Sequence, residues 1–207
     1  KIRGKKGSLK RWCTSIPLTN VYDLLNIGSL SLEEIPTNAF ISNLFSNYKF
    51  PIKLNVTKEL MRLIGYYLSE GYSRESKTVN QVAFRICNKI MQKDIVNIIE
   101  KTFGCKVNLG EENSKITICH KPIYYLFVYC LGLGKNAYSK RLPTFIYGLS
   151  KDLICEFVGA YLDGDGSVVD SRNCVIFYSV CRSLLDDLAL LLSKYGLVSR
   201  FSTTKAR

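Results

Sequence analysis

Two short stretches of this sequence end in an acid beside a glycine, and these two acids could do chemistry. One stretch, Leu63 to Gly71, runs through aliphatic, small and aromatic residues and reaches Glu70 just before its last glycine. The other, Phe157 to Gly166, repeats that order of residue types and places Asp165 in the same position. Each stretch predicts a helix that glycine ends, leaving one carboxylate at the helix tip.

Small residues at matching places in the two stretches indicate how the acids would meet. When Glu70 is set against Asp165, Gly65 falls opposite Ala160. Small residues that face each other let two helices pack almost backbone to backbone, which would bring both carboxylates to the base of the helix pair. Two like charges so close are unfavourable unless a cation lies between them. The pattern therefore predicts a divalent-metal site.

Carboxylates that hold divalent metals supply what phosphodiester hydrolysis requires. They help to activate a water molecule, to neutralise the phosphate and to stabilise the leaving oxygen. We expect Glu70 and Asp165 to bind Mg²⁺ (or Mn²⁺), with the backbone carbonyl groups of Ser69 and Gly164 completing a shell of oxygen ligands. Asp163 is expected to cap its own turn rather than to bind the metal.

Together the two motifs resemble the LAGLIDADG family of homing endonucleases, in particular the double-motif type embedded in inteins. The resemblance covers about Val56 to Lys205, and it implies that Glu70 and Asp165 are the metal-binding, catalytic acids. Glutamate at position 70 departs from the family name but keeps a hard oxygen ligand. The resemblance further implies one carboxylate for each DNA strand and a staggered double-strand break.

The family also uses basic residues near the metals. Lys140, just before Leu142-Pro143, is a candidate for that catalytic role, and a solvated surface lysine is the alternative reading. Its counterpart in the second copy would lie beyond Arg207.

Composition limits the partners and the compartment. The formal net charge is +12 with a pI near 9.3, which indicates a polyanion and most simply nucleic acid. No apolar run has transmembrane length, no signal-peptide pattern opens the chain, and the eight cysteines suit buried free thiols in a reducing compartment. We therefore expect a cytoplasmic, DNA-associated protein without a membrane partner. The single histidine and the lack of CxxC pairs argue against histidine-based catalysis and structural zinc.

The elements that must position the acids form an internal repeat. After each motif we expect a strand, an amphipathic helix and further strands, with a polar turn at Tyr72 to Thr78 and a strand over Val79 to Cys87 in the first copy. The predicted fold class is α+β, with tandem αββαββα-type repeats, two motif helices at a pseudo-twofold axis and antiparallel sheets that form a DNA-binding saddle.

Three segments are expected in the chain. They are a basic arm with a small appended region (1–55), the first repeat (56–150) and a truncated second repeat (151–207). Because Arg207 falls where the first copy enters its hairpin, the strand at Phe201 would be an unpaired edge.

DNA contacts are expected from two sources. The arm Lys1 to Arg11 holds six basic residues and no acid, so Lys5 and Lys6 could lie along phosphates, although a solvated connector is an equal reading. Strand alternation predicts base-reading side chains in the major groove, namely Gln81, Arg85, Ser179, Arg200 and Thr203.

The function that these patterns favour is site-specific, metal-dependent double-strand DNA cleavage by a monomer. The partner would be double-stranded DNA with a long asymmetric or pseudo-palindromic target. No splicing residues are visible, so self-splicing is not expected of this chain. Two alternatives remain open: a non-cleaving DNA- or RNA-binding module, used as a regulator or as an intron-splicing helper, and an inactive remnant.

Overall fold

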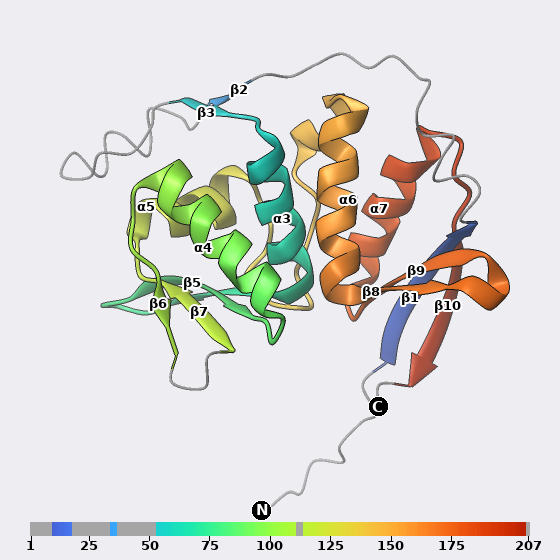
Figure 1. The fold of residues 1–207 in the computed structure, drawn as a ribbon, viewed down its shortest axis with the longest axis horizontal. Coiled ribbons are helices and arrows are strands. Elements are labelled where there is room, and N and C mark those ends of the chain that lie inside the picture. Colours follow the sequence, from blue (N-terminus) through green and yellow to red (C-terminus); the bar gives the residue numbers. More distant parts are fainter. Residues whose placement is uncertain (1–9, 18–33, 37–52, 111–113, 206–207) are drawn as a thin grey trace, which may run out of the picture.

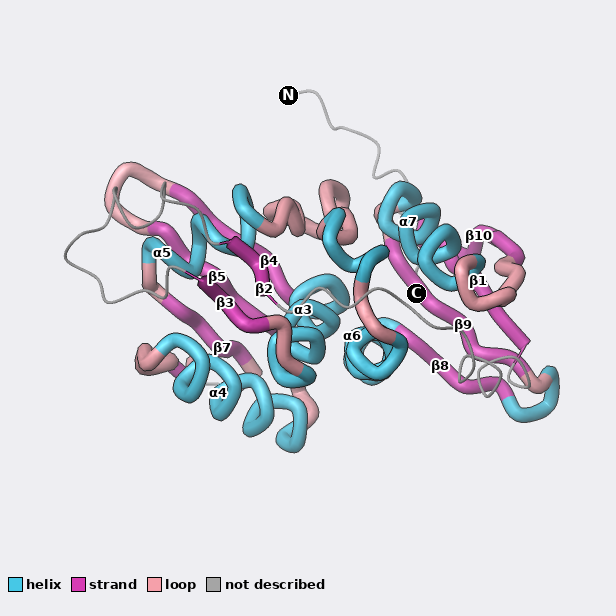
Figure 2. Tube along the Cα trace, turned by 90° about the horizontal axis from the view of Figure 1, so that it is seen from above, coloured by secondary structure: helices cyan, strands magenta, loops and turns pink. Residues whose placement is uncertain are grey.

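The computed structural model describes residues 10–17, 34–36, 53–110 and 114–205. Two helices lie side by side in the middle, and a four-stranded antiparallel sheet lies on each side of them (Figures 1 and 2). Both sheets lie toward the C-terminal ends of the central helices. The fold class is α+β, as predicted. No helix in the described ranges is long and apolar enough to cross a membrane.

The central pair consists of α3 (Lys58–Glu70) and α6 (Lys151–Asp165). Thr57 caps the start of α3, where its side-chain oxygen accepts the backbone N–H of Leu60 at 3.2 Å. A methyl group added at Gly65 would lie 2.6 Å from the Phe157 carbonyl oxygen and 2.8 Å from the Ala160 Cβ. The predicted crossing through small residues is therefore confirmed.

The first sheet has the strand order β4-β5-β7-β6. Its strands are β4 (Gly71–Glu75), β5 (Asn80–Arg85), β6 (Asn108–Leu109) and β7 (Lys115–Ile118). The amphipathic helix predicted after β5 is α4 (Lys89–Phe103), and Gly104 ends it with φ of 63°. Behind β7 follow α5 (Lys121–Tyr125) and the π-helix η2 (Leu126–Cys130).

The predicted polar turn at Tyr72 to Thr78 is wrong, because β4 begins directly where α3 ends. Its backbone pairs with β5 over five residues, from Gly71 opposite Phe84 to Glu75 opposite Asn80. Tyr72 and Arg74 alternate with the buried Gly71 and Ser73, so polarity at this strand marks a partly exposed strand face and not a turn.

The second sheet has the strand order β10-β1-β9-β8. Its strands are β1 (Lys10–Pro17), β8 (Gly166–Val169), β9 (Cys174–Ser179) and β10 (Arg200–Lys205). The helix α7 (Arg182–Ser193) packs on β1 and β9 with five buried leucines: Leu184, Leu185, Leu188, Leu191 and Leu192.

The strand β1 corrects two expectations about the second repeat. It pairs with β9 on one side and with β10 on the other, six residue pairs in each case. It thereby takes the sheet position that β7 takes between β5 and β6. The strand at Phe201 is therefore paired, and Lys10–Pro17 belong to the second sheet instead of an appended region. The missing strand comes from the other end of the chain.

The remaining described elements are short. β2 (Glu34–Pro36) pairs with β3 (Lys53–Asn55) directly before α3, and two 3₁₀ turns, η3 (Thr144–Gly148) and η4 (Asp170–Arg172), connect larger elements. The cysteines from Cys87 to Cys181 are free thiols, and among these only Cys181 is buried. Cys87, Cys130 and Cys155 are exposed, contrary to the expectation of burial.

Candidate functional site

The C-terminal tips of α3 and α6 touch each other. A methyl group added at Gly164 would overlap the Ser69 side chain and would lie 3.1 Å from Glu70 Cγ. Glycine at this position thus lets the end of the second motif lie against the end of the first. Glu70 is the last residue of α3 and Asp165 the last of α6, so both acids project from the base of the helix pair.

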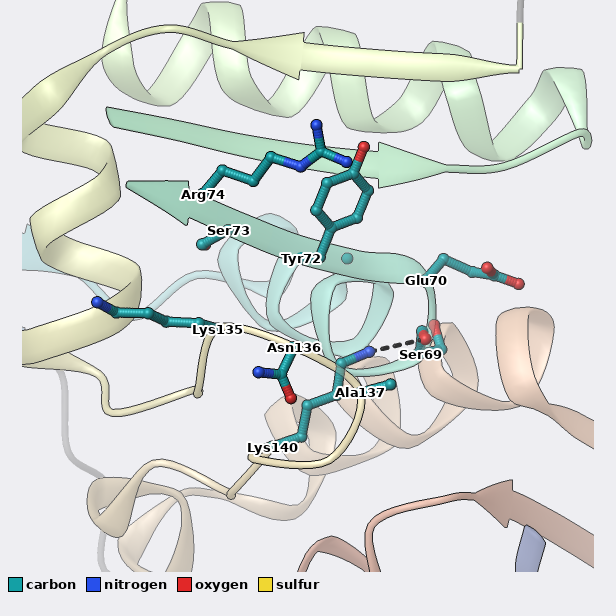
Figure 3. Close-up of a pocket in the computed structure, with 10 residues that line it drawn as sticks. Ser69, Glu70, Tyr72, Ser73, Arg74, Lys135, Asn136, Ala137 and Lys140 are labelled. Atoms are coloured by element: carbon teal, nitrogen blue, oxygen red, sulfur yellow. Dashed lines mark hydrogen bonds between the residues drawn. The ribbon is translucent and has the colours of Figure 1, made fainter. Parts of the chain in front are cut away.

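Lys140 reaches this base from an irregular segment. Its ammonium group donates a hydrogen bond to the Ser69 carbonyl oxygen at 2.9 Å, and the residue is only 4% exposed (Figure 3). Burial lowers the pKa of Lys140 to about 8, while the charges of Asp165 and Glu70 act in the opposite direction. The ammonium group therefore interacts electrostatically with both acids. Lys140 lies at the acidic site, and the reading of a solvated surface lysine is wrong.

A cavity of about 470 Å³ opens beside this lysine. Figure 3 shows residues from the end of α3, from β4 and from the segment 135–140 around it. Glu70 and Lys140 line it together with Tyr72, Arg74 and Lys135. The cavity thus joins Glu70 to the outer face of the first sheet.

The outer face of the first sheet is basic and polar. The pairing register places Arg74 opposite Gln81, and Arg85 opposite Lys115. A second recess, of about 510 Å³, is lined by Tyr72, Arg74, Arg85, Ser114 and Lys115, and none of these described lining residues is acidic. Gln81 and Arg85 therefore lie on the predicted face.

Tyr72, Arg74 and Lys115 were not among the predicted contacts. The alternation of Tyr72 and Arg74 is the signal that could have identified them, but it was read as a turn. The arm residues Lys5 and Lys6 lie outside the described residues.

Two predicted contacts on the second sheet do not lie on its outer face. Ser179 is buried, and its hydroxyl oxygen accepts the backbone N–H of Cys181 at 3.0 Å. Thr203 lies opposite Trp12, which also pairs with Ser179, so it belongs to the same helix-facing side. Side chains alternate between the two faces of a strand, so an error of one residue in the predicted register moves every side chain to the other face. Arg200 is exposed and lies on the opposite, outer side of β10.

Contacts from the second repeat hold the segment around Lys140. Cys181 donates its thiol hydrogen to the Lys140 carbonyl oxygen at 3.2 Å. Arg141 donates two hydrogen bonds to the Asp187 carboxylate, at 2.6 and 2.8 Å, and the Leu142 N–H donates to it at 3.2 Å. The acids and the lysine thus come from three parts of the chain, and two repeats meet at the site.

Comparisons with known proteins find relatives of this chain. The chain is 39% identical over 185 residues to the DNA polymerase II large subunit of Thermococcus kodakarensis. This match covers 88% of the chain and 10% of that protein. It is 30% identical over 162 residues to an uncharacterised protein of Methanocaldococcus jannaschii. This match covers 72% of the chain and 18% of that protein. The chain therefore spans well under a third of the length of either relative.

One solved structure with some likeness is the homing endonuclease I-WcaI bound to its DNA recognition sequence. The likeness covers 84% of this chain and 92% of that one, with a TM-score of 0.36 and 15% sequence identity. A family model described as a LAGLIDADG-like domain matches residues 152–207, which hold α6 except its first residue, all of β8 to β10 and α7. Residues 152–207 of this chain are therefore similar to a LAGLIDADG-like domain.

Proposed function

We propose that this chain is a metal-dependent, site-specific endonuclease that cuts double-stranded DNA. The observation that carries the proposal is the buried ammonium group of Lys140, which lies at the tips of α3 and α6 under the influence of both Glu70 and Asp165. Two acids and a buried cation that open onto a basic, polar sheet face suit the hydrolysis of a phosphodiester.

The residues at the helix tips suit a divalent metal. Glycine at 164 keeps side-chain bulk away from the tips, and the donors there are hard oxygen atoms. Glu70 and Asp165 would hold Mg²⁺ or Mn²⁺, with the carbonyl oxygens of Ser69 and Gly164. The Ser69 carbonyl oxygen accepts from Lys140 and keeps a second lone pair. The metal would supply a more acidic water molecule and neutralise charge on the phosphate.

The remaining steps fall to the chain's own residues. Water adds through its oxygen to phosphorus, the bond from phosphorus to the leaving sugar oxygen breaks, and the proton of the water ends on that leaving oxygen. We assign to Lys140 the stabilisation of negative charge on the reacting phosphate. Arg74, Arg85 and Lys115 would hold neighbouring phosphates or base edges along the first sheet.

The proposed context is an element inserted into a host protein, as in an intein. The chain matches the polymerase subunit over 88% of its own length but covers only 10% of that protein, which suits a discrete insertion. Both acidic motifs lie on one chain, so a monomer would carry a complete site. The expected target is a long, asymmetric or pseudo-palindromic duplex.

Cleavage of a plasmid library with randomised inserts tests this proposal. Wild-type protein with Mg²⁺ should linearise a subset of plasmids whose cut ends share one sequence. The Glu70→Gln variant, and wild-type protein in EDTA, should leave them intact. Duplex binding in a gel shift without any cleavage would instead favour the alternative, a non-cleaving binding module, which the basic recess of the first sheet alone could support.

A further inference from the structure

The position of Lys140 depends on hydrogen bonds to both repeats. It lies in an irregular segment between η2 and η3, so no strand or helix ladder fixes its backbone. The ammonium group is held at the first repeat by the Ser69 carbonyl oxygen. The backbone around it is held by the second repeat, through Cys181 and α7. The lysine therefore spans the boundary between the repeats.

Asp187 makes most of the hydrogen bonds that hold the backbone next to Lys140. Its carboxylate accepts two hydrogen bonds from the Arg141 guanidinium and one from the Leu142 N–H, which are the two residues after Lys140. The Asp187 side chain is 14% exposed, whereas Arg141 is 58% exposed. Bidentate pairs between arginine and a carboxylate fix direction as well as distance. The backbone carbonyl of Asp187 also accepts the Tyr147 hydroxyl at 3.2 Å, which ties down the same segment further along.

We infer that Asp187 is a positioning residue, which fixes Lys140 against the paired acids from across the repeat boundary. This inference rests on the proposed function, because it assigns to α7 a role in the reaction at the base of α3 and α6. Asp187 touches neither the acids nor the cavity beside them and acts only through the segment 140–142. A displacement of about 1 Å at a reacting group can cost on the order of 100-fold in rate.

The neighbouring acid provides a matched control. Asp186 lies on the same helix and pairs with Arg182 one turn earlier, at 2.8 Å, with half of its side chain exposed. Its salt bridge stays within α7 and does not reach the segment 140–142. Asp186→Asn therefore changes the charge of α7 by the same amount as Asp187→Asn without loosening Lys140.

The first experiment measures the accessibility of Lys140 without DNA or metal. Acetic anhydride labels lysine amines, and mass spectrometry gives the rate at each site. In the wild type Lys140 should react slowly because it is buried. Asp187→Asn should raise its rate several-fold, and Asp186→Asn should not. Lys151 on α6, which is 8% exposed, serves as an internal control for unfolding and should stay slow in all three proteins.

The second experiment measures cleavage and binding of a plasmid that the wild type cuts. Asp187→Asn should lower the single-turnover cleavage rate about 10- to 100-fold, while the dissociation constant for the same DNA changes less than about twofold. Arg141→Met, at an exposed position, should act in the same direction and covers the case in which Asp187→Asn folds poorly.

The outcomes separate the two proposals. An Asp187→Asn protein with unchanged Lys140 labelling overturns the inference, and so does a parallel rise at Lys151. A normal cleavage rate in that variant overturns it as well. A wild type that labels as expected but cuts no plasmid contradicts the proposed endonuclease, and with it the part of Asp187 in a reaction.

Discussion

At the scale of single residues, the balance of charge at the helix tips decides what each substitution does. The buried Lys140 ammonium group attracts both Glu70 and Asp165, and the two acids carry charges of the same sign. Removal of one acid relieves repulsion but also weakens the electrostatic support for that ammonium group. Stability and activity should therefore respond differently to the same change.

Asp165→Asn should abolish cleavage and leave DNA binding nearly intact. Asparagine keeps the shape of the side chain but loses the charge that would hold a divalent metal. The two electrostatic effects on metal-free protein oppose each other, so the melting temperature should change little. Plasmid cleavage, gel shift and thermal unfolding measure these three quantities. The control is Asp163→Asn, at an exposed position two residues earlier, which should cut normally. Undiminished cleavage by Asp165→Asn would remove Asp165 from the mechanism.

Lys140 should make stability depend on pH in a way that Lys140→Met does not. Its pKa is about 8 in the folded state against 10.5 for an ordinary lysine, so between these values the unfolded chain binds more protons. The free energy of unfolding must then rise with pH across that window. From pH 7.5 to 9.5 the wild type should gain roughly 1–3 kcal/mol relative to Lys140→Met.

Urea unfolding at both pH values, in EDTA, measures this difference directly. The methionine variant keeps an apolar stem of similar length and has no group to titrate, so other ionisable residues cancel in the comparison. A gap between the two proteins that stays constant with pH would contradict the lowered pKa.

The sequence located the acids and the lysine, but it located only some of the sheet residues. The two acids were predicted from a motif that occurs twice, and Lys140 was predicted from its position before Leu142-Pro143. Neither prediction depends on strand register. Ser179 and Thr203 were misplaced because the face of a strand depends on a register that one residue can shift. Tyr72 and Arg74 were missed because α3 runs into β4 with no intervening loop.

At the scale of elements, the helix pair offers a test with a built-in control. Gly65→Ala should destabilise the protein by more than about 1 kcal/mol, since the new methyl group would lie 2.6 Å from the Phe157 carbonyl oxygen, which is backbone and cannot move freely. Gly159→Ala on α6 has no atom within 4 Å and should stabilise by roughly 0.5–1 kcal/mol through helix propensity. Chemical denaturation of both variants checks the sign of each change.

The strand β1 should be required for the second sheet. Deletion of residues 1–17 removes the strand between β9 and β10 and leaves β10 without its only described partner in the sheet. Hydrogen exchange in β9 and β10 should then become fast, while β5 stays protected. Deletion of residues 1–9 leaves β1 in place and is the matched control. Retained protection in the longer deletion would contradict the pairing.

This strand also shows why the second sheet could not be predicted fully. The run Lys10–Pro17 begins with two basic residues and ends with proline, a pattern that suggests an arm or an edge strand. Its partners lie near the other end of the chain, and no local periodicity reports so distant a pairing. The order of elements within each repeat could be predicted from the sequence. The pairing of β1 with strands near the other end of the chain is shown only by the sheet topology.

At the scale of the whole molecule, the net charge of +12 favours binding to a polyanion. On the first sheet Arg74, Arg85 and Lys115 share one recess on the outer face, while α4 covers the other side of the sheet. A basic side chain on the outer face should contact DNA phosphates, whereas a basic side chain on α4 should not. The location of DNA contacts can therefore be measured with any duplex, before the target is known.

Arg85→Gln and Lys115→Gln should each reduce the slope of log K against log salt concentration by about 0.9, because each removes one cation from contact with phosphate. Lys101→Gln, at an exposed position near the end of α4, removes the same charge and should leave the slope unchanged. Deletion of residues 1–9 adds the corresponding test for the arm: a flatter slope means that Lys5 and Lys6 contact DNA, and an unchanged slope leaves the arm as a connector. Equal slopes for Lys101→Gln and Arg85→Gln would show that binding follows net charge alone, and the outer face of the first sheet would lose its place as the DNA contact.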